Sequence, residues 1–258
     1  MKKIIVLVVL TLSFGVLAST VSASHSWGGY HWSRTTSVLS LKLGDNLSSA
    51  WDPYLATAST DWSISSVLET TVVSGLGGRN CKPTSGRVEV CNRTYGKNGW
   101  LGLAQIWISS GHITQGVVKV NDTYFNTSKY NNPNERLHVV CQEVGHTFGL
   151  DHQSEDGSSQ NTCMDYFSNT GANAGSATST KPNQHDYDEL EAIYAHLHAP
   201  TSPLPTKNGN GSGNAMVDLD DSRAWGKIIS ESSDKRSSIF ERDLGKGNKV
   251  LTFVTWVE

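Results

Sequence analysis

The sequence predicts an α+β fold in which a mixed β-sheet is backed by one helix. Apolar and polar residues alternate from Val38 to Leu43, which predicts a strand. Residues 48–62 follow with apolar side chains at helical spacing. Further short strands are expected at 67–73, 87–90, 101–108 and 117–120. The order of one strand, one helix and several strands is typical of a mixed sheet with a helix on one face.

The most clearly marked helix begins at Asn132. Asn132 is a typical N-cap residue, Pro133 suits the first helical position and Glu135 suits the third. Apolar residues then recur at helical spacing and predict a core-facing stripe, which consists of Leu137, Cys141, Val144 and Phe148. Gly149 is expected to end this helix in a left-handed conformation. A later helix is expected from Pro182 to about His198.

The first 23 residues predict export. Met1-Lys2-Lys3 precedes an apolar run from Ile4 to Leu17, and small residues follow up to Ala23. The apolar run is shorter than the ~20 residues that a membrane-spanning helix needs. We therefore expect a signal peptide at residues 1–23, a secreted protein, and no stable membrane association after cleavage.

The charge of the chain limits the kinds of binding partner that we expect. The 258 residues carry a net charge of −3, and loss of the two lysines in residues 1–23 would bring it to −5. Lysine and arginine form no cluster, which argues against a nucleic acid or an anionic membrane as partner. The oligomeric state is not indicated.

Glu143, His146 and His152 form the pattern that points to chemistry. A catalytic zinc ion needs three protein ligands, an open position for water, and a carboxylate that takes a proton from this water. Residues 142 and 146 lie one helical turn apart on the same face, and Glu143 projects beside them. Gly149 permits the sharp turn that would bring His152 back as a further ligand.

This segment resembles the metzincin zinc peptidases, whose signature is His-Glu-x-x-His-x-x-Gly-x-x-His followed by a Met-turn. The chain matches four of the five fixed positions, namely Glu143, His146, Gly149 and His152. The segment 161–166 is similar to the Met-turn, with its methionine at Met164. The resemblance covers roughly residues 35–198 and implies a zincin-like mixed sheet with a backing helix, an active-site helix and a C-terminal helix.

The resemblance also implies a function. It points to a zinc metalloendopeptidase that acts on a polypeptide substrate, with Glu143 as general base and Tyr166 as a donor to the oxyanion. It further implies that the strand at 103–108 is a sheet edge that pairs with an extended substrate. The alternative is a catalytically inactive metzincin-fold module that binds a polypeptide or a surface glycan.

The departure from the signature is Gln142, where the family has its first histidine. A glutamine oxygen is a poorer zinc ligand than an imidazole. Three interpretations remain open: Gln142 binds zinc through its oxygen, another residue completes the site, or the site is inactive. His138 lies two helical turns, about 12 Å, from His146 and is set aside, and nothing in the sequence places His112 nearby. We expect Gln142 to be a ligand.

The four cysteines are expected to form two disulfides in an exported protein. Three pairings are possible, and sequence alone cannot choose among them. Cys81–Cys91 is favoured because it closes a short loop that contains turn residues. Cys141–Cys163 is favoured because each of these cysteines directly precedes one half of the proposed metal site. No Cys-x-x-Cys spacing occurs, which argues against a cysteine zinc site.

The proposed catalytic domain spans residues 24–198. Residues 199–214 are rich in proline, glycine and asparagine and are expected to be a linker. Residues 215–258 are expected to form an extension with a β-hairpin, which turns at Gly245–Asn248. This extension either packs on the catalytic domain or recruits a target. No pro-segment with a cysteine latch is visible, so the means of restraining activity is open.

Two other groups of residues have weaker functional interpretations. His196 and His198 are expected to be surface or helix-capping residues. Acidic and amide side chains suit calcium, but no calcium-binding loop of known spacing is present, so solvated loops are the preferred interpretation. These residues are Asn121, Asp122, Asp218, Asp220 and Asp221.

Overall fold

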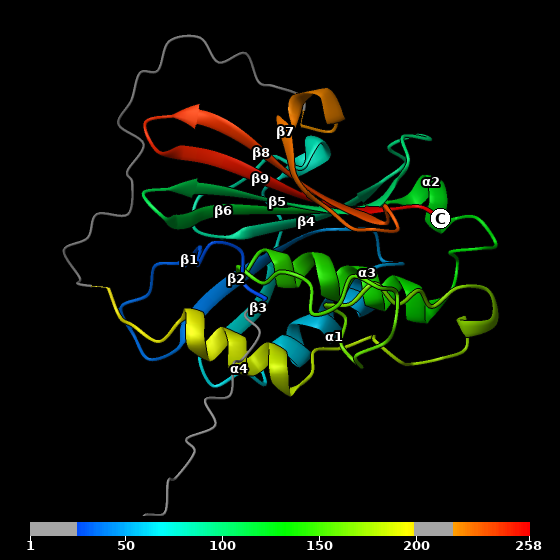
Figure 1. Cartoon of the computed structure of the whole chain (residues 1–258), viewed down its shortest axis with the longest axis horizontal. Coiled ribbons are helices and arrows are strands. Elements are labelled where there is room, and N and C mark those ends of the chain that lie inside the picture. Colours follow the sequence, from blue (N-terminus) through cyan, green and yellow to red (C-terminus); the bar gives the residue numbers. More distant parts are fainter. Residues whose placement is uncertain (1–24, 199–218) are drawn as a thin grey trace, which may run out of the picture.

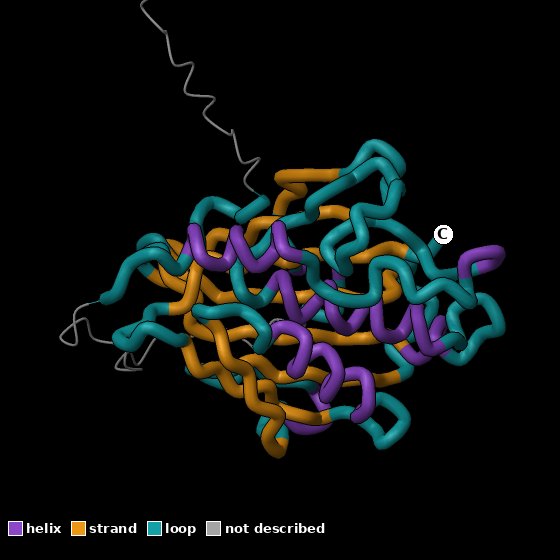
Figure 2. The backbone as a smooth tube through the Cα atoms, turned by 90° about the horizontal axis from the view of Figure 1, so that it is seen from below, coloured by secondary structure: helices purple, strands orange, loops and turns teal. Residues whose placement is uncertain are grey.

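The computed structural model describes residues 25–198 and 219–258. The predicted signal peptide (1–23) and linker (199–214) lie outside the described residues. The described residues form an α+β fold with a nine-stranded mixed sheet and few helices, which confirms the predicted fold class at this level. The longer helices lie along one face of the sheet, below it in Figure 1 and in front of it in Figure 2.

The sheet changes from parallel to antiparallel partway across. Strands β2, β3, β4 and β6 pair in parallel, whereas β5, β9, β8 and β7 continue the sheet with antiparallel pairs. In spatial order the strands are β3 (Leu68–Ser74), β2 (Leu39–Asn46), β4 (Val88–Arg93), β6 (His112–Asn121), β5 (Trp100–Ser109), β9 (Asn248–Trp256), β8 (Ser237–Gly245) and β7 (Lys227–Glu231). A two-residue strand, β1 (His31–Trp32), pairs with the start of β6.

Three of the described helices lie close to where the sequence predicts them, and the short α2 (Asp122–Phe125) was not predicted. The three are α1 (Asp52–Trp62), α3 (Pro133–His146) and α4 (Gln184–Ile193). The sequence predicted a longer α4, from Pro182 to His198. Asn183 and Asp186 form a capping box that sets its start, and the helix ends after Ile193. Beyond it, the backbone N–H of His198 donates to the carbonyl of Arg34, so the chain leaves the helix to contact the N-terminal segment.

The central strand β4 contains a buried carboxylate. Arg87 and Glu89 alternate with the apolar Val88 and Val90 as expected, yet Glu89 is fully buried. The side chain of Asn46 donates to Glu89, as do two backbone N–H groups, and Arg87 lies 2.9 Å away as an ion pair. Burial of this charge is tolerated because its Oε2 atom accepts three hydrogen bonds and its Oε1 atom faces the Arg87 guanidinium.

The C-terminal strands belong to the same sheet as the rest of the chain. β8 and β9 form the predicted hairpin, and β9 pairs with β5 from Ser109 to Trp100 (Figure 1). The expectation that residues 103–108 form a sheet edge is therefore wrong. The physical reason is apolar burial, since Leu251 and Phe253 of β9 continue the main hydrophobic core.

None of the helices in the described residues has both the length and the apolar character that a bilayer-spanning segment needs.

Candidate metal centre

Helix α3 carries the candidate site and is held at its start by the predicted cap. The side chain of Asn132 accepts a hydrogen bond from the backbone N–H of Glu135, at 2.9 Å, and Pro133 occupies the first turn. A cap of this kind is worth about 1 kcal/mol. The helix is buried through most of its length, so Gln142, Glu143 and His146 lie in the interior of the molecule.

Gly149 makes the turn that follows α3. Its φ of +103° lies in the region that favours glycine. A Cβ atom at this position would lie 2.1 Å from the backbone oxygen of Tyr30, so the N-terminal segment leaves no room for a side chain. The predicted role of Gly149 thus has two causes, its backbone conformation and this close contact. The turn brings His152 back toward α3.

The imidazoles of His146 and His152 converge. Their Nε2 atoms lie 3.0 Å apart, and both rings are buried. Two nitrogens bound to one tetrahedral zinc ion would lie roughly 3.3 Å apart. The outer nitrogens have partners as well, because the Nδ1 of His146 lies 2.9 Å from the carbonyl of Leu150 and the Nδ1 of His152 lies 2.8 Å from the hydroxyl of Tyr166. Such outer partners orient metal-binding imidazoles.

The electrostatics of the site favour neutral groups. Burial, together with the nearby His152, lowers the pKa of His146 to about 3. The neutral imidazole is the form that binds metals. Burial raises the pKa of Glu143 to about 8, against the effect of a hydrogen bond from Thr255. Within the described chain, the Oε2 atom of Glu143 is buried and has no hydrogen-bond partner.

Both the nitrogen and the oxygen of the Gln142 side-chain amide have hydrogen-bond partners. Its Nε2 donates to the carbonyl of Asp165 at 2.8 Å. The hydroxyl of Thr255 lies 2.9 Å from the Oε1 of Gln142 and 2.8 Å from the Oε1 of Glu143. A hydroxyl has one proton, so it donates to one of these oxygens, and a protonated Glu143 can donate to it in turn. The two converging imidazoles suit a zinc ion, and the oxygen of Gln142 can serve as a further ligand only when its hydrogen bond with Thr255 is broken.

The loop 161–166 packs beneath α3. A Cβ atom on Gly145 would lie 2.5 Å from the sulfur of Met164, so the helix and the loop touch closely. Next to this contact, Cys141 and Cys163 lie at disulfide distance with Cα atoms 5.9 Å apart. The other predicted pair, Cys81 and Cys91, is also at disulfide distance, with Cα atoms 6.0 Å apart.

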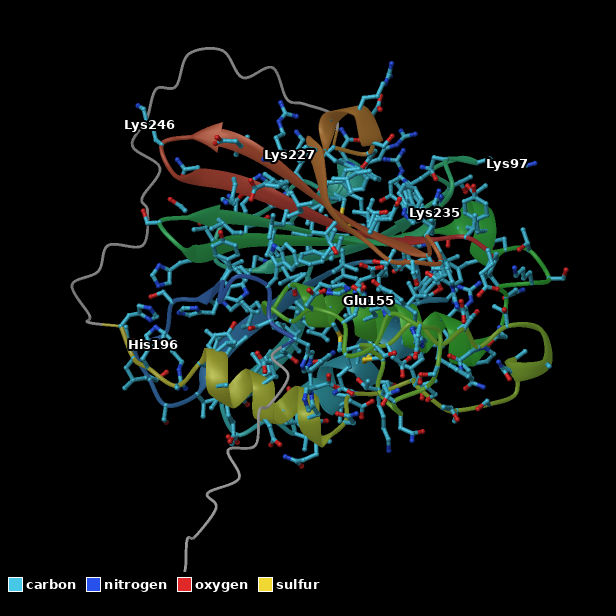
Figure 3. The ribbon with its side chains drawn as sticks, viewed as in Figure 1. Lys97, Glu155, His196, Lys227, Lys235 and Lys246 are labelled. Carbon is cyan, nitrogen blue, oxygen red and sulfur yellow. A yellow bond between two sulfur atoms is a disulfide. The ribbon has the colours of Figure 1, made fainter. Side chains whose placement is uncertain are left out.

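Carboxylates approach the site from the far side of His152. The residues Asp151, His152 and Glu155 offer donor atoms that lie close enough together to hold an ion. Asp151 lies 3.5 Å from the Nδ1 of His152, whereas His146 faces the Nε2 atom of the same ring. Glu155 lies in the loop after α3 and is labelled in Figure 3. One ion therefore cannot use this carboxylate group and the converging Nε2 atoms together.

Strand β9 covers the site. The ring of Phe253 stacks on His146, with centroids 4.5 Å apart, and Thr255 contacts Gln142 and Glu143. The β8–β9 hairpin that carries these residues turns at Lys246, toward the left in Figure 3, whereas Lys235 lies in the turn between β7 and β8. Sequence reasoning missed both contacts, because an alternating strand does not reveal its neighbour.

Little open space remains at α3. A cavity of about 20 Å³ lies against Gln142 and Thr255. It shares several lining residues with a cavity of about 680 Å³ beside the C-terminus, namely Phe167, Ser168, Arg236 and Glu258. The larger cavity does not include the two imidazoles among its lining residues. Access to the site therefore depends on the end of β9.

The calcium candidates have protein partners. Asp220 pairs with Lys119, Asp221 pairs with Arg223, and Asp122 accepts a hydrogen bond from Trp51. Asn121 caps α2. Asp218 lies outside the described residues.

A second group of histidines was missed by sequence reasoning. His31, His196 and His198 offer ligand atoms within 4.8 Å of one another, and His112 adjoins them. Their positions are far apart in the sequence, so only the short spacing of His196 and His198 hinted at a shared site.

Comparison with known proteins adds no assignment. Neither protein-family models nor curated proteins provide a match to this chain.

Proposed function

We propose that this chain is a secreted, zinc-dependent peptidase of the metzincin type that cleaves polypeptides. The observation that carries the proposal is the convergence of the His146 and His152 Nε2 atoms beside the buried carboxylate of Glu143. The unpartnered Oε2 of Glu143 supports it, because a buried oxygen without a partner is costly unless a ligand or water uses it.

His146 and His152 would hold the ion, and the side-chain oxygen of Gln142 would be the third ligand. When bound, zinc polarises a carbonyl group and lowers the pKa of a water molecule. Leu150 and Tyr166 hold the outer nitrogens of the two imidazoles and so keep Nε2 directed inward. Tyr166 contacts His152 directly, which supports an orienting role for it beside the oxyanion role that the resemblance implies.

Glu143 has the properties of a general base. Its raised pKa lies near neutral pH, where a carboxylate can both accept a proton from water and return it to a leaving amine. Gly102 on β5 lies so close that a Cβ atom there would be 2.7 Å from Glu143 Oε1. This contact holds the carboxylate between α3 and β5.

The proposal includes a closed state. In the metzincins that this sequence resembles, an extended substrate pairs with the strand that corresponds to β5. In this chain β9 occupies that position in antiparallel pairing. Its Thr255 contacts the proposed base and the proposed third ligand. Activity then requires that the last residues of β9 move away from α3.

The same contacts favour one competing function. A protein that only binds a polypeptide or glycan would have no need for an accessible Glu143, and Gln142 already has two protein partners. An inactive module with a metzincin-like fold is therefore the alternative.

Truncation after Val254 separates the two functions, because it removes Thr255 and the C-terminal residues that follow while leaving most of β9. Caseinolysis should be measured for the full chain and for the truncated chain, each with and without Glu143→Gln. We expect higher activity in the truncated chain, abolished by Glu143→Gln. Gln142→His should tighten zinc binding, since imidazole is the better ligand.

A different result would favour the binding module. The truncated chain would then remain folded, as judged by circular dichroism, and would hydrolyse casein no faster than its Glu143→Gln variant. Unchanged zinc affinity in Gln142→His would remove position 142 from the ligand set.

A further inference from the structure

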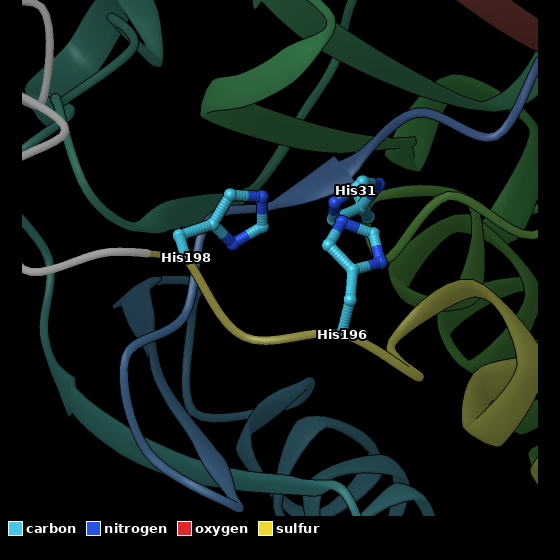
Figure 4. Close-up of side chains that lie close together, drawn as sticks. All are labelled: His31, His196 and His198. Atoms are coloured by element: carbon cyan, nitrogen blue, oxygen red, sulfur yellow. The ribbon is translucent and has the colours of Figure 1, made fainter.

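Four histidines from three separate segments meet at one end of the sheet. His31 lies on β1, His112 begins β6, and His196 and His198 follow α4. Figure 4 shows the rings of His31, His196 and His198 gathered together. Their ring centroids lie between 4.8 and 5.3 Å apart, and those of His112 and His198 lie 4.4 Å apart.

His31 has a nitrogen prepared for a ligand. Its Nδ1 lies 2.7 Å from the carbonyl of Gly29, and since a carbonyl only accepts, Nδ1 carries the proton. The lone pair of the neutral ring is then on Nε2. This atom is buried and lacks a hydrogen-bond partner in the part of the chain that the structure describes, and the side chain as a whole is 8% exposed. An unpaired buried acceptor costs about 1–3 kcal/mol.

The other rings bring possible metal-ligand nitrogens close to His31. One ligand atom from each of His31, His196 and His198 lies within 4.8 Å of the others. The Nε2 atoms of His112 and His198 lie 2.6 Å apart, so they share a proton in the absence of an ion. The backbone N–H of Arg34 donates to the Nδ1 of His198 at 3.2 Å.

Packing alone does not account for this arrangement. Histidines can pack against one another as ordinary aromatic rings, but a core histidine normally has its ring nitrogens paired. Here the most buried ring of the group has an unpaired nitrogen, and this ring contacts the other imidazoles. His196 is exposed, so an ion can reach the group from solvent.

We infer that His31, His196 and His198 bind a divalent transition-metal ion of the zinc class, with the Nδ1 of His198 taking the ion in place of the Arg34 N–H and His112 holding its Nε2. Imidazole is a preferred ligand of such ions. The ion would join β1, the β5–β6 hairpin and the segment after α4, which are otherwise connected in this region by backbone and side-chain hydrogen bonds. This site is independent of the proposed catalytic site on α3.

Metal stoichiometry of the full chain, purified without a polyhistidine tag, tests the inference. After dialysis against Zn²⁺ and removal of free ion, elemental analysis should find about two ions per chain in wild type and about one in the double variant His196→Ala/His198→Ala. Leu197→Ala is the matched control, because Leu197 lies between these histidines and is exposed, and it should retain the wild-type content. Equal zinc content in wild type and the double variant overturns the inference.

A background without the α3 site keeps the test independent of the proposed function. In His152→Ala, which lacks a candidate ligand of α3, added Zn²⁺ should still raise the melting temperature, because the ion binds only the folded chain. The rise should vanish when His196→Ala/His198→Ala is added. His112→Ala should weaken zinc affinity by about 10- to 100-fold, as expected for loss of an outer partner. A zinc-dependent rise that persists without His196 and His198 overturns the assignment.

Discussion

The two histidine groups of this protein differ in how they are assembled and enclosed. His146 and His152 come from one helix and the turn after it, and β9 covers them. The second group draws on three segments that are distant in sequence, and one side of it is open to solvent. A site within one local motif can be predicted from residue spacing, whereas a site built by tertiary contacts cannot.

The two groups also differ in chemistry, because the first is buried and the second is partly exposed to solvent. Buried imidazoles next to a buried carboxylate, as on α3, stay neutral and exclude bulk water, which suits a site that activates a bound water molecule. An exposed group of imidazoles can exchange an ion with solvent. The second group, His31, His196 and His198, includes no carboxylate. We therefore propose a catalytic role for the first group and a structural ion for the second.

The largest effect is expected at Gly149, which joins the two regions through its contact with Tyr30, the residue before His31. Gly149→Ala should lower the free energy of unfolding by about 3 kcal/mol or more, because it combines positive φ with a backbone clash. Chemical denaturation measures this loss, and metal content should fall at both sites. Gly171→Ala is the control, since Gly171 has positive φ but open space, and its cost should be about 1 kcal/mol. Equal losses in the two variants would refute the clash.

The burial of α3 can be tested at Glu135, which lies in the first turn of this helix and is buried. Burial raises its pKa from 4.5 to about 7. The folded state therefore binds this proton more tightly than the unfolded state does. Its contribution is fully present below pH 4.5 and is lost as pH rises through about 7, a change of up to about 3 kcal/mol.

Glu135→Gln should flatten the dependence of unfolding free energy on pH between 4.5 and 8, as measured by urea denaturation at several pH values. Glu69→Gln, at an exposed position on β3, should leave the dependence as in wild type. An unchanged slope in Glu135→Gln would show that this carboxyl group is not enclosed.

The two disulfides provide a matched pair, one beside the α3 site and one away from it. Replacement of Cys141 and Cys163 by serine should cost about 3 kcal/mol, and replacement of Cys81 and Cys91 should cost about the same. Only the first change should weaken zinc retention at α3, because this bridge joins the helix to the loop that contains Met164. Thermal unfolding and zinc titration measure the two effects. Zinc retention that survives loss of Cys141–Cys163 would argue against a supporting role.

The smallest effect on stability is expected at Thr255, through which β9 contacts α3. Thr255→Val keeps the shape of the side chain but removes the hydroxyl between Gln142 and Glu143, and should cost about 1–3 kcal/mol. Thr252→Val on the same strand should cost less, because its partner Gln105 keeps a second acceptor, the carbonyl of Leu219. Denaturation curves of the two variants compare them directly. A larger loss for Thr252→Val would mean that the Thr255 contacts do not hold β9 in place.

Much of the local structure could be predicted from the sequence. The cap at Asn132, the turn at Gly149 and the hairpin at Gly245–Asn248 each depend on residues within one turn or loop. The convergence of His146 and His152 follows from the same local geometry. The expected pairs of cysteines also lie close together in the structure, Cys81–Cys91 across a short loop and Cys141–Cys163 between α3 and the loop that contains Met164.

The errors arose where distant segments meet. β5 has the alternating pattern of any strand, so the pattern could not reveal that β9 lies beside it. His196 is exposed as expected, but only the tertiary structure brings it and His198 against His31 and brings His198 against His112. Helix α4 was expected to be longer, because its buried stripe did not reveal the contact of His198 with Arg34.

By itself, the sequence determined the α+β class, the elements that surround α3, and the residues that the turn at Gly149 can bring together. Only the tertiary structure decided which strand covers these residues and which histidines form the second group. The physical reason is that a cap, a turn or a helical face depends on a few neighbouring dihedral angles. Strand order, and the meeting of distant side chains, depend on how the whole apolar surface is buried.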